Sequence, residues 1–300
     1  MTEVIKRSPF FYVGDKFKLI SQLKSSFPKD IDRFIEPFCG GGSVFLNTKA
    51  KHYVVNDIDS YMINLHRFLQ SNSKNTEAFW KNIKQTIEKF GLSATFLHTD
   101  IPKEYRQQYP KTYFAKYNKT AYENMRNEFN KQKDNMLYLY LLLIYGFNRM
   151  LRFNRKGDFN LPVGNVDFNF NVEKALNDYL NVISNIDIAF YSTDFVKFIT
   201  EVKPTKNDFV YLDPPYLITF SEYNKLWTTT DELRLLELLD KLNEQGVRFA
   251  ISNVIWHKKR YNAIFNEWAQ KYNIIKIKSN YISYHDNTEK DSYEVLVTNC

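Results

Sequence analysis

The chain has 300 residues, of which 44% are hydrophobic and 25% are charged, and its 41 Lys and Arg residues against 34 Asp and Glu residues give a net charge of +7. This composition excludes a disordered or fibrous chain and predicts one large domain, or one domain that carries an insertion. The excess of positive charge favours a polyanionic partner such as nucleic acid.

The cysteines, the histidines and the apolar runs exclude further classes of protein. Cys39 and Cys300 are the only cysteines, too few for a disulfide framework, so we expect a reducing cytoplasm. The histidines lie singly, without the spacing of zinc ligands, so we expect no metal site. The N-terminus lacks the apolar core of a signal peptide, and residues 136–147 form an apolar run of about half a membrane span. We therefore expect a buried helix there and no membrane partner.

A strand–helix–strand pattern opens the chain. Residues 33–38 (RFIEPF) predict a short strand, residues 44–50 (VFLNTKA) predict the start of a helix, and residues 52–57 (HYVVND) predict a second strand. This order is that of a βαβ unit, which predicts a parallel pair of strands.

The middle of the chain, roughly residues 70–185, shows only helical patterns. Residues 76–91 and 119–134 place apolar side chains at helical spacing, and the apolar run follows them. Residues 147–165 then form a polar loop rich in Arg and Asn. We interpret this region as a helical insertion in an α/β domain.

Strands and helices alternate again in the last third of the chain. Amphipathic helices are predicted over residues 231–246 and 257–272, between strands over residues 186–192, 208–214, 248–253, 273–279 and 293–299. The last two strands are joined by a loop too short for a crossover, so we expect them to pair antiparallel. The first and last regions together predict one mostly parallel sheet.

A glycine turn follows the first predicted strand. Open α/β sheets bind nucleotides at such turns, but Cys39-Gly40-Gly41-Gly42 lacks the spacing of a dinucleotide fingerprint, so S-adenosylmethionine is the expected ligand. Asp57 ends the second strand, where such folds place an acid on ribose hydroxyls. The alternatives are a tight connection for the glycines and a helix N-cap for Asp57.

The strand over 208–214 ends in Asp213-Pro214-Pro215-Tyr216. An exocyclic amine on adenine is a poor nucleophile because its lone pair is delocalised into the ring. The Asp213 carboxylate and the Pro214 carbonyl can accept both amino hydrogens and draw that lone pair towards a methyl sulfonium, while Tyr216 offers a flat face for a base. The alternative is a proline-stiffened turn.

These motifs resemble those of the Dam-type, alpha-group DNA adenine-N6 methyltransferases over nearly the whole chain. The matching segments, in order, are SPFFYVGDKFKLI (8–20), FIEPFCGGGSVFLN (34–47), NDIDSY (56–61) and VYLDPPY (210–216). The resemblance implies a Rossmann-like class I methyltransferase sheet with an antiparallel last strand. It also implies a catalytic domain over residues 1–70 and 171–300, with a helical DNA target-recognition domain over residues 71–170.

The resemblance assigns a role to individual residues. It implies that the cofactor contacts Tyr12, Lys16, Phe38, Gly40, Gly42, Asp57, Asp194, Phe195 and Asp213. It makes Asp213, Pro214, Pro215 and Tyr216 the catalytic set. In the polar loop, which resembles the DNA hairpin of the family, it implies DNA contacts by Phe147, Asn148, Met150, Arg152, Asn154 and Lys156.

Two departures from the family concern the recognition sequence. Phe11 replaces a Lys that some members use to read the outer guanine, and residues 283–292 replace an Asn- and Gly-rich loop. GATC is therefore only the first expected site. The segment over 217–230 is expected to close over the flipped base, with Phe220, Tyr223 and Trp227 packing either on that base or on the sheet edge.

The resemblance implies double-stranded DNA as the partner, and we expect a monomer in the cytoplasm at the nucleoid. The sequence leaves open whether a restriction endonuclease shares its site. The alternatives are an RNA or protein N-methyltransferase, which Asp213 and the insertion disfavour, and a catalytically inactive DNA-binding regulator, which the intact tetrapeptide disfavours.

Overall fold

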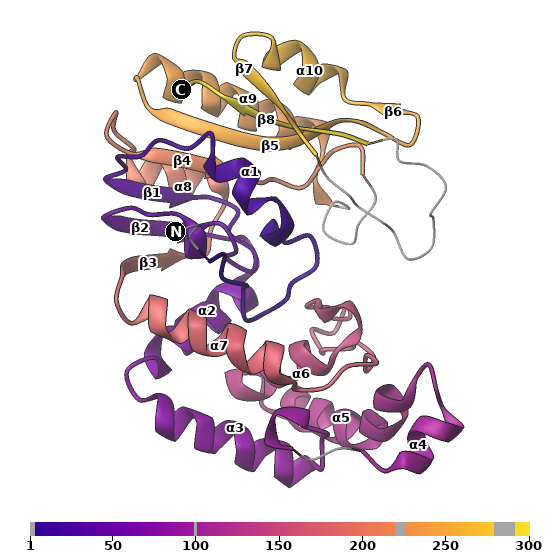
Figure 1. Ribbon diagram of the computed structural model, residues 1–300. Coiled ribbons are helices and arrows are strands. Elements are labelled where there is room, and N and C mark those ends of the chain that lie inside the picture. The colour runs from indigo at the N-terminus through magenta and orange to yellow at the C-terminus, as the bar shows by residue number, and fades with distance from the viewer. Residues whose placement is uncertain (1–3, 99–100, 220–225, 279–291) are drawn as a thin grey trace. The chain divides into compact units, whose positions relative to one another are not determined.

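A computed structural model describes residues 4–98, 101–219, 226–278 and 292–300 (Figure 1). The chain divides into two compact units. The helical unit comprises Met1–Asp15, Gly40–Leu46 and Asp59–Ile186, and the sheet unit comprises Lys16–Cys39, Asn47–Ile58 and Asp187–Cys300. The division into a catalytic and a target-recognition domain stays a prediction about function.

The sheet unit is built on a mostly parallel sheet with the strand order β3-β2-β1-β4-β5-β8-β7 (Figure 1). The first five strands in this order run parallel, and β8 runs antiparallel to both β5 and β7. The class I methyltransferase sheet with an antiparallel last strand is thus confirmed. The strands are β1 (Arg33–Glu36), β2 (His52–Asn56), β3 (Asp187–Tyr191), β4 (Phe209–Leu212), β5 (Arg248–His257), β6 (Arg260–Tyr261), β7 (Asn273–Ile277) and β8 (Ser292–Thr298).

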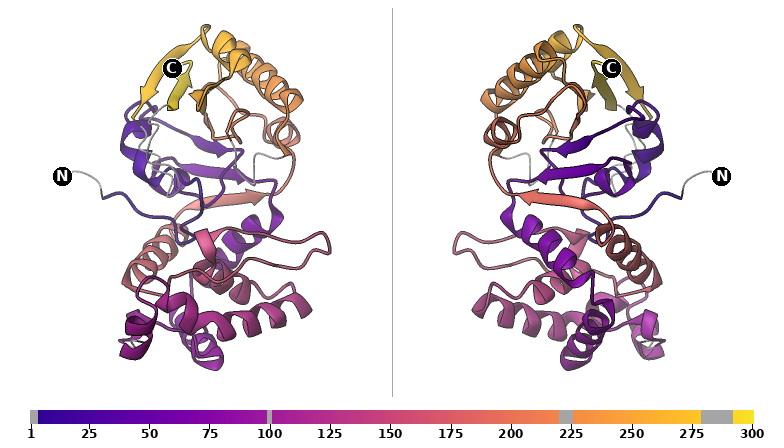
Figure 2. Two further views of the ribbon diagram at one scale, coloured as in Figure 1. Left: turned by 90° about the vertical axis from the view of Figure 1, so that its right-hand side faces the viewer. Right: turned by 90° about the vertical axis from the view of Figure 1, so that its left-hand side faces the viewer.

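Alternating side chains of these strands pack on helices from opposite faces. Val210 and Leu212 face a core that they share with α8 (Phe195–Val202), α9 (Thr229–Glu244) and α10 (Ala263–Ala269). On the other face, Phe27 packs on Phe209 and Tyr211 and follows η1 (Phe17–Leu19) and α1 (Ile20–Lys24). Figure 2 shows α8–α10 and α1 on opposite sides of the strands.

The helical unit is arranged around α6, whose apolar run buries every side chain from Leu139 to Tyr145. The prediction of a buried helix in this run is confirmed. None of the described helices is long and apolar enough to cross a membrane. The elements are η2 (Phe45–Asn47), α2 (Ser60–Asn72), α3 (Thr76–Phe90), η3 (Thr95–Leu97), α4 (Lys103–Gln108), α5 (Tyr113–Lys131), α6 (Met136–Tyr145), η4 (Phe147–Arg149) and α7 (Phe170–Ile183).

The helix predicted over residues 44–50 is wrong, because only the 3-10 helix η2 forms between β1 and β2. Successive side chains from Val44 to Leu46 are buried, which leaves no polar face for an amphipathic helix. The Tyr53 hydroxyl then closes the connection, since it donates to the Thr48 carbonyl at 2.8 Å and accepts from the Ala50 amide at 3.0 Å.

The helix predicted over residues 257–272 is wrong in its first half. Strand β5 continues to His257, and Lys258 and Lys259 turn the chain with φ angles of 46° and 66°. The two-residue strand β6 then pairs back on β5, and the Asn262 side chain caps the start of α10. Pairing in the sheet therefore overrides the helical spacing of this segment.

Candidate functional site

Four predicted site residues lie at the carboxyl ends of adjacent parallel strands in the sheet unit. Phe38, Asp57, Asp194 and Asp213 follow β1, β2, β3 and β4, which are neighbours in the order β3-β2-β1-β4. Carboxyl ends of parallel strands share one edge of a sheet, which is where open α/β sheets bind ligands. The topology thus brings residues that are far apart in the sequence to a common edge.

The buried side chain of Asn56 ties three of these strand ends together. Its Nδ2 donates to the carbonyls of Pro37 at 2.9 Å and Thr193 at 3.0 Å, and its Oδ1 accepts from the Thr193 amide at 3.0 Å. The loops that carry Phe38 and Asp194 are thereby fixed to the end of β2. Sequence reasoning did not single out Asn56, although it directly precedes the predicted ribose ligand.

A buried cation and a second acid contact the predicted catalytic tetrapeptide. The Lys16 Nζ lies 2.7 Å from an Asp213 carboxylate oxygen, with 4% of the lysine side chain and 18% of the aspartate exposed. The Tyr216 hydroxyl lies 2.9 Å from Asp213 Oδ1 and 3.2 Å from Glu294 Oε1 on β8. The Lys16 Nζ also lies 5.1 Å from the centre of the Tyr216 ring. The predicted cofactor residue and two predicted catalytic residues therefore form one cluster.

Negative charge gathers around this cluster. Burial raises the pKa of the Tyr211 hydroxyl well above its ordinary value, and the neighbouring charges of Asp213, Glu36 and Glu294 raise it further. Glu36 and Glu294 are both buried. Sequence reasoning missed Glu294, although an acid inside the apolar run YEVLVT is the kind of signal that marks a functional position.

A cluster of aromatic rings lies beside the strand ends of β1 and β3. The rings of Phe38 and Phe195 are 5.3 Å apart, and Trp227 lies 5.8 Å from Phe38 and 5.7 Å from Phe195. Trp227 thus anchors the chain after the tetrapeptide to the sheet unit, as one of the two sequence interpretations expected. Phe220 and Tyr223, and residues 283–291 of the segment that differs from the family, lie outside the described residues.

The Asp194 carboxylate makes contacts within the protein. It accepts from the amides of Val196 and Lys197 at the start of α8, and the Arg234 Nη2 lies 3.0 Å from each of its oxygens. Asp194 is therefore a helix cap as well as a predicted cofactor residue.

Asp57 is not a helix cap. The cap of α2 is Asp59, which accepts from the amides of Tyr61 at 2.9 Å and Met62 at 3.4 Å. Burial, followed by the charges of Asp57 and Glu36, raises the pKa of the Cys39 thiol well above its ordinary value, which favours the neutral thiol over the thiolate.

The glycine turn packs on the N-terminal motif within the helical unit. Gly40 and Gly42 adopt φ angles of 45° and 77°, which other residues rarely do. A Cβ on Gly41 would lie 3.0 Å from the Cβ of Tyr12, so glycine permits the close approach of these two segments. His66 lies with Nε2 2.8 Å from the Gly40 carbonyl oxygen and holds the turn in place.

The polar loop over residues 147–165 forms an antiparallel hairpin in the helical unit. Bridges join Gly146 to Val163 and Phe153 to Phe159. The hairpin is braced from outside by Tyr61, whose ring stacks on Phe153 at 4.2 Å.

The predicted DNA-contacting residues differ in their solvent exposure and in their contacts within the protein. Phe147 is 50% exposed, and Asn148, Asn154 and Lys156 are also exposed, whereas Met150 and Arg152 are half-buried. The Arg152 guanidinium donates to the side-chain oxygen of Asn160 at 3.0 Å and to its backbone carbonyl at 2.6 Å. The Asn154 side chain accepts from the Lys156 amide at 2.8 Å and so shapes the tip of the hairpin.

Two arginines meet one aromatic ring at the base of this hairpin. The guanidinium carbons of Arg149 and Arg7 lie 4.4 Å and 4.6 Å from the centre of the Phe11 ring. Burial, together with the charge of Arg7, lowers the pKa of Arg149 to about 10. A cavity of about 310 Å³ opens beside them and is lined by Phe11, Gly146, Phe147, Asn148, Arg149, Gly164, Asn165 and Val166.

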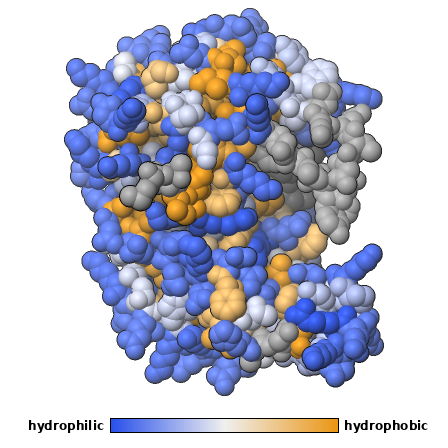
Figure 3. Space-filling model, in the orientation of Figure 1, coloured by the Kyte–Doolittle hydropathy of each residue, from blue (hydrophilic) through white to orange (hydrophobic). Residues whose placement is uncertain are grey.

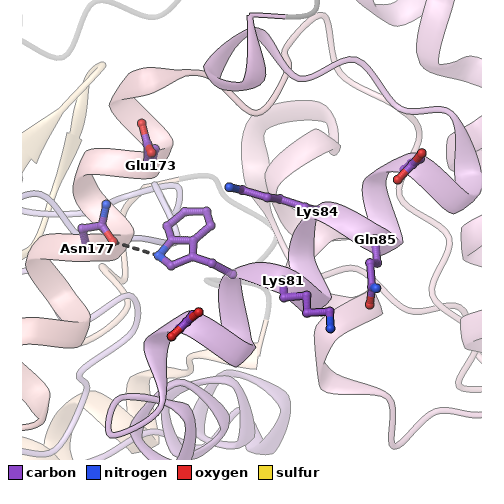
Figure 4. A pocket seen from close by; sticks show the side chains of 8 residues that line it. Lys81, Lys84, Gln85, Glu173 and Asn177 are labelled. Atoms are coloured by element: carbon purple, nitrogen blue, oxygen red, sulfur yellow. Dashed lines mark hydrogen bonds between the residues drawn. The ribbon is translucent and has the colours of Figure 1, made fainter.

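A second cavity, of about 670 Å³, lies on α3 and α7, where the Trp80 Nε1 donates to the Asn177 side-chain oxygen at 2.9 Å. Figure 4 shows Lys81, Lys84 and Gln85 on α3, with Glu173 and Asn177 on α7. The site residues predicted from the sequence do not line this cavity. The face drawn in Figure 3 is mostly hydrophilic with small separate apolar areas, which is usual for a protein surface.

A family model and several relatives match this chain. The model, described as D12 class N6 adenine-specific DNA methyltransferase, matches residues 12–282. The chain is 35% identical over 302 residues to the type II methyltransferase M.FokI of Planomicrobium okeanokoites, and 34% identical over 304 residues to the modification methylase StsI of Streptococcus sanguinis. Each alignment covers 98% of this chain and 43% of the relative, so the chain spans less than half the length of these two proteins.

A third relative is matched over most of its length. The chain is 28% identical over 297 residues to the DNA adenine methylase of Escherichia coli strain K12, covering 95% of this chain and 92% of that protein. The family model extends over most of the chain, from the N-terminal motif through the glycine turn, the hairpin and the tetrapeptide. The chain therefore belongs to the family of D12 class N6 adenine-specific DNA methyltransferases.

Proposed function

We propose that this chain transfers a methyl group from S-adenosylmethionine to the N6 atom of an adenine that is flipped out of duplex DNA. The observation that carries the proposal is the position of Asp213. It directly follows the central parallel strand β4, it is paired with Lys16 at 2.7 Å, and it is contacted by the hydroxyl of Tyr216 at 2.9 Å.

The residues at the strand ends of the sheet unit fit S-adenosylmethionine. When bound, this cofactor supplies an electrophilic methyl group on a positively charged sulfur. The negative charges of Asp213, Glu36 and Glu294 around Tyr211 suit a cationic ligand. In this proposal Asp57 accepts from ribose hydroxyls, and Phe38 and Phe195 offer ring surface to a purine. Tyr12, Gly40 and Gly42 remain cofactor candidates from the sequence.

The tetrapeptide supplies the groups that activate an adenine amine. The Asp213 carboxylate and the Pro214 carbonyl accept its two hydrogens, so that the nitrogen lone pair is available for attack. Lys16 and the Tyr216 hydroxyl orient the carboxylate from two sides. The Tyr216 ring, itself held through its hydroxyl, is the surface on which the base stacks.

The hairpin is the proposed DNA reader. Phe147 is exposed at its base beside Asn148, whose φ of 55° is strained for a residue other than glycine. An exposed aromatic ring next to polar side chains suits entry into a base stack, and Lys156 at the tip suits phosphate contact. GATC is the first sequence to test.

We further propose that the chain acts as a monomer in the cytoplasm at the nucleoid, in a restriction–modification setting. The restriction–modification setting is supported by the relatives, since they include a type II methyltransferase and a modification methylase. The partner is then a restriction endonuclease of the same specificity.

Methylation-sensitive sequencing of DNA from cells that express the chain tests the proposal, because it reports the base, the atom and the site together. The host must lack adenine methylation of its own, and the Asp213→Ala variant is the control. We expect N6-methyladenine at one short sequence with the natural chain and none with the variant. Unmodified DNA in both strains, with both proteins folded and present, would contradict the proposal.

A further inference from the structure

A carboxylate is buried at the start of α9 without a cationic partner among the described residues. Glu232 is fully buried, and its oxygens accept from the Trp227 Nε1 at 2.8 Å and from the Nδ2 atoms of Asn253 at 3.1 Å and Asn262 at 3.0 Å. All three donors are neutral. Burial raises the pKa of this carboxyl, which reflects the cost of removing its charge from water.

Burying this carboxylate costs more free energy of desolvation than burying an apolar side chain at the same position would. Hydrogen bonds from neutral groups and the positive end of the α9 dipole offset part of the desolvation, but a leucine would need no such compensation. The neighbouring helix positions Leu235, Leu236 and Leu239 are apolar and pack in the core of the sheet unit. Packing alone therefore does not explain a glutamate at position 232, which indicates a role for its carboxylate.

What Glu232 orients is the indole of Trp227. That ring lies 5.8 Å from Phe38 and 5.7 Å from Phe195, which are themselves 5.3 Å apart. A rotation of the indole away from Glu232 would break its N–H hydrogen bond and open the contact with both rings. The carboxylate thus selects one orientation of the aromatic cluster.

A second side chain of α9 supports the same cluster. Arg234 binds the Asp194 carboxylate through Nη2, at 3.0 Å to each oxygen, and its guanidinium carbon lies 5.1 Å from the centre of the Phe195 ring. The start of α9 is itself fixed by a capping box between Thr228 and Asp231. Helix α9 therefore presents two supports, one to Trp227 and one to the Asp194-Phe195 pair.

We infer that Glu232 and Trp227 are positioning residues for cofactor binding, which hold the rings of Phe38 and Phe195 in the arrangement that accepts the purine of S-adenosylmethionine. The inference rests on the proposed function. Neither residue belongs to the tetrapeptide that activates the adenine amine, so both should act on cofactor affinity and leave the methyl-transfer step unchanged once cofactor is saturating.

The first test is Glu232→Gln. Its amide oxygen can still accept from Asn253 and Asn262, but its NH₂ group would face the indole N–H of Trp227, so only that contact is lost. We expect the Kd for S-adenosylmethionine and the KM for cofactor to rise about tenfold, because the rings are then no longer held in the binding arrangement before the cofactor arrives. The kcat at saturating cofactor and the Kd for DNA should stay within about twofold of the natural chain.

Trp227→Phe tests the same contact from the other side and keeps an aromatic ring in place. It should also raise the cofactor Kd. The Kd of the double variant should not exceed that of the weaker-binding single variant, because both substitutions remove the same interaction. The matched control is Glu237→Gln, which removes an exposed acid of the same helix that pairs with Lys241. It should leave the cofactor Kd unchanged.

The outcomes separate this inference from the proposed function. A natural chain that binds cofactor and methylates DNA, with Glu232→Gln and Trp227→Phe folded and equal to it in cofactor Kd, overturns the inference alone. A loss of kcat with unchanged KM in both variants also overturns it. If Glu232→Gln does not fold, Trp227→Phe decides. A natural chain without affinity for the cofactor in calorimetry overturns the inference and the proposed function together.

Discussion

The ammonium of Lys16 lies 2.7 Å from the carboxylate of Asp213, although the two residues belong to motifs that are far apart in the sequence. Both side chains are largely buried, so the charge of each acts strongly on the other. The N-terminal motif therefore acts directly on the group proposed to be catalytic, in addition to its predicted role in cofactor binding.

Asp213→Ala should abolish methyl transfer while leaving DNA affinity within a few-fold, because the carboxylate acts mainly in the transition state. It should also lower the free energy of unfolding by about 3–5 kcal/mol, since Lys16 loses its Asp213 partner in a buried site. Methylation assays, DNA titrations and denaturant unfolding measure the three effects. The double variant Lys16→Met/Asp213→Ala should recover stability without activity. Equal losses in DNA affinity and rate would count against a catalytic role.

Asp57→Ala should weaken the binding of S-adenosylmethionine by about 1–3 kcal/mol, the range for losing a charge-assisted hydrogen bond. The control is Asp59→Ala, because Asp59 and not Asp57 caps α2. That variant should lower the free energy of unfolding by about 1 kcal/mol with unchanged cofactor affinity. Calorimetry compares the two, and equal cofactor affinity in Asp57→Ala and the natural chain would remove Asp57 from the site.

Arg152→Ala should relax discrimination at one guanine of the recognition sequence by about 1–3 kcal/mol. Lys156→Ala should instead weaken binding to all sequences alike and flatten the salt dependence, because Lys156 is exposed and is proposed to contact phosphate. Competition binding with single-base variants of the site, at several salt concentrations, measures both. A uniform loss of affinity in Arg152→Ala, with site preference intact, would falsify the base-reading role.

Asn160→Ala provides a further control for Arg152. It removes the side-chain oxygen that accepts from the Arg152 Nε at 3.0 Å while leaving the guanidinium in place. If Arg152 reads a base in the orientation that Asn160 supports, this variant should shift specificity in the same direction as Arg152→Ala, by a smaller amount. Unchanged specificity would show that Arg152 reaches DNA independently of this hydrogen bond.

His66 should make stability depend on pH. Burial lowers the pKa of its ring from 6.5 to about 4, against the opposing effect of the hydrogen bond that its Nε2 donates to the Gly40 carbonyl. Its Nδ1 accepts from the Tyr179 hydroxyl. A lowered pKa in the folded state means that the stabilisation is present above pH 6.5 and is lost as the pH falls towards 4, by about 3 kcal/mol in total. Denaturant unfolding at pH 7 and pH 5 should show a smaller difference in His66→Gln than in the natural chain. Equal differences would place this pH dependence elsewhere.

Local patterns in the sequence were enough to predict most of the sheet and the ends of its strands. The apolar strand before Asp213 and the strand before Asp57 are encoded by neighbouring residues, and their carboxyl ends in a parallel sheet share one edge. The helix over residues 44–50 was predicted wrongly, because a hydroxyl of Tyr53 on the next strand closes that loop. The effect of the Tyr53 hydroxyl on residues 48–50 cannot be predicted from the spacing of apolar residues within that segment.

By itself the sequence determined which chemical groups this protein has and the strand ends on which they lie, since apolar periodicity and short motifs are properties of adjacent residues. Only the tertiary structure decided the partners of those groups. The pairing of Lys16 with Asp213 depends on two distant segments meeting in one cluster, and the capture of Trp227 by Glu232 depends on the start of α9. Such contacts follow from strand order, register and burial, which are set by the packing of the whole unit and leave no periodic signal in the chain.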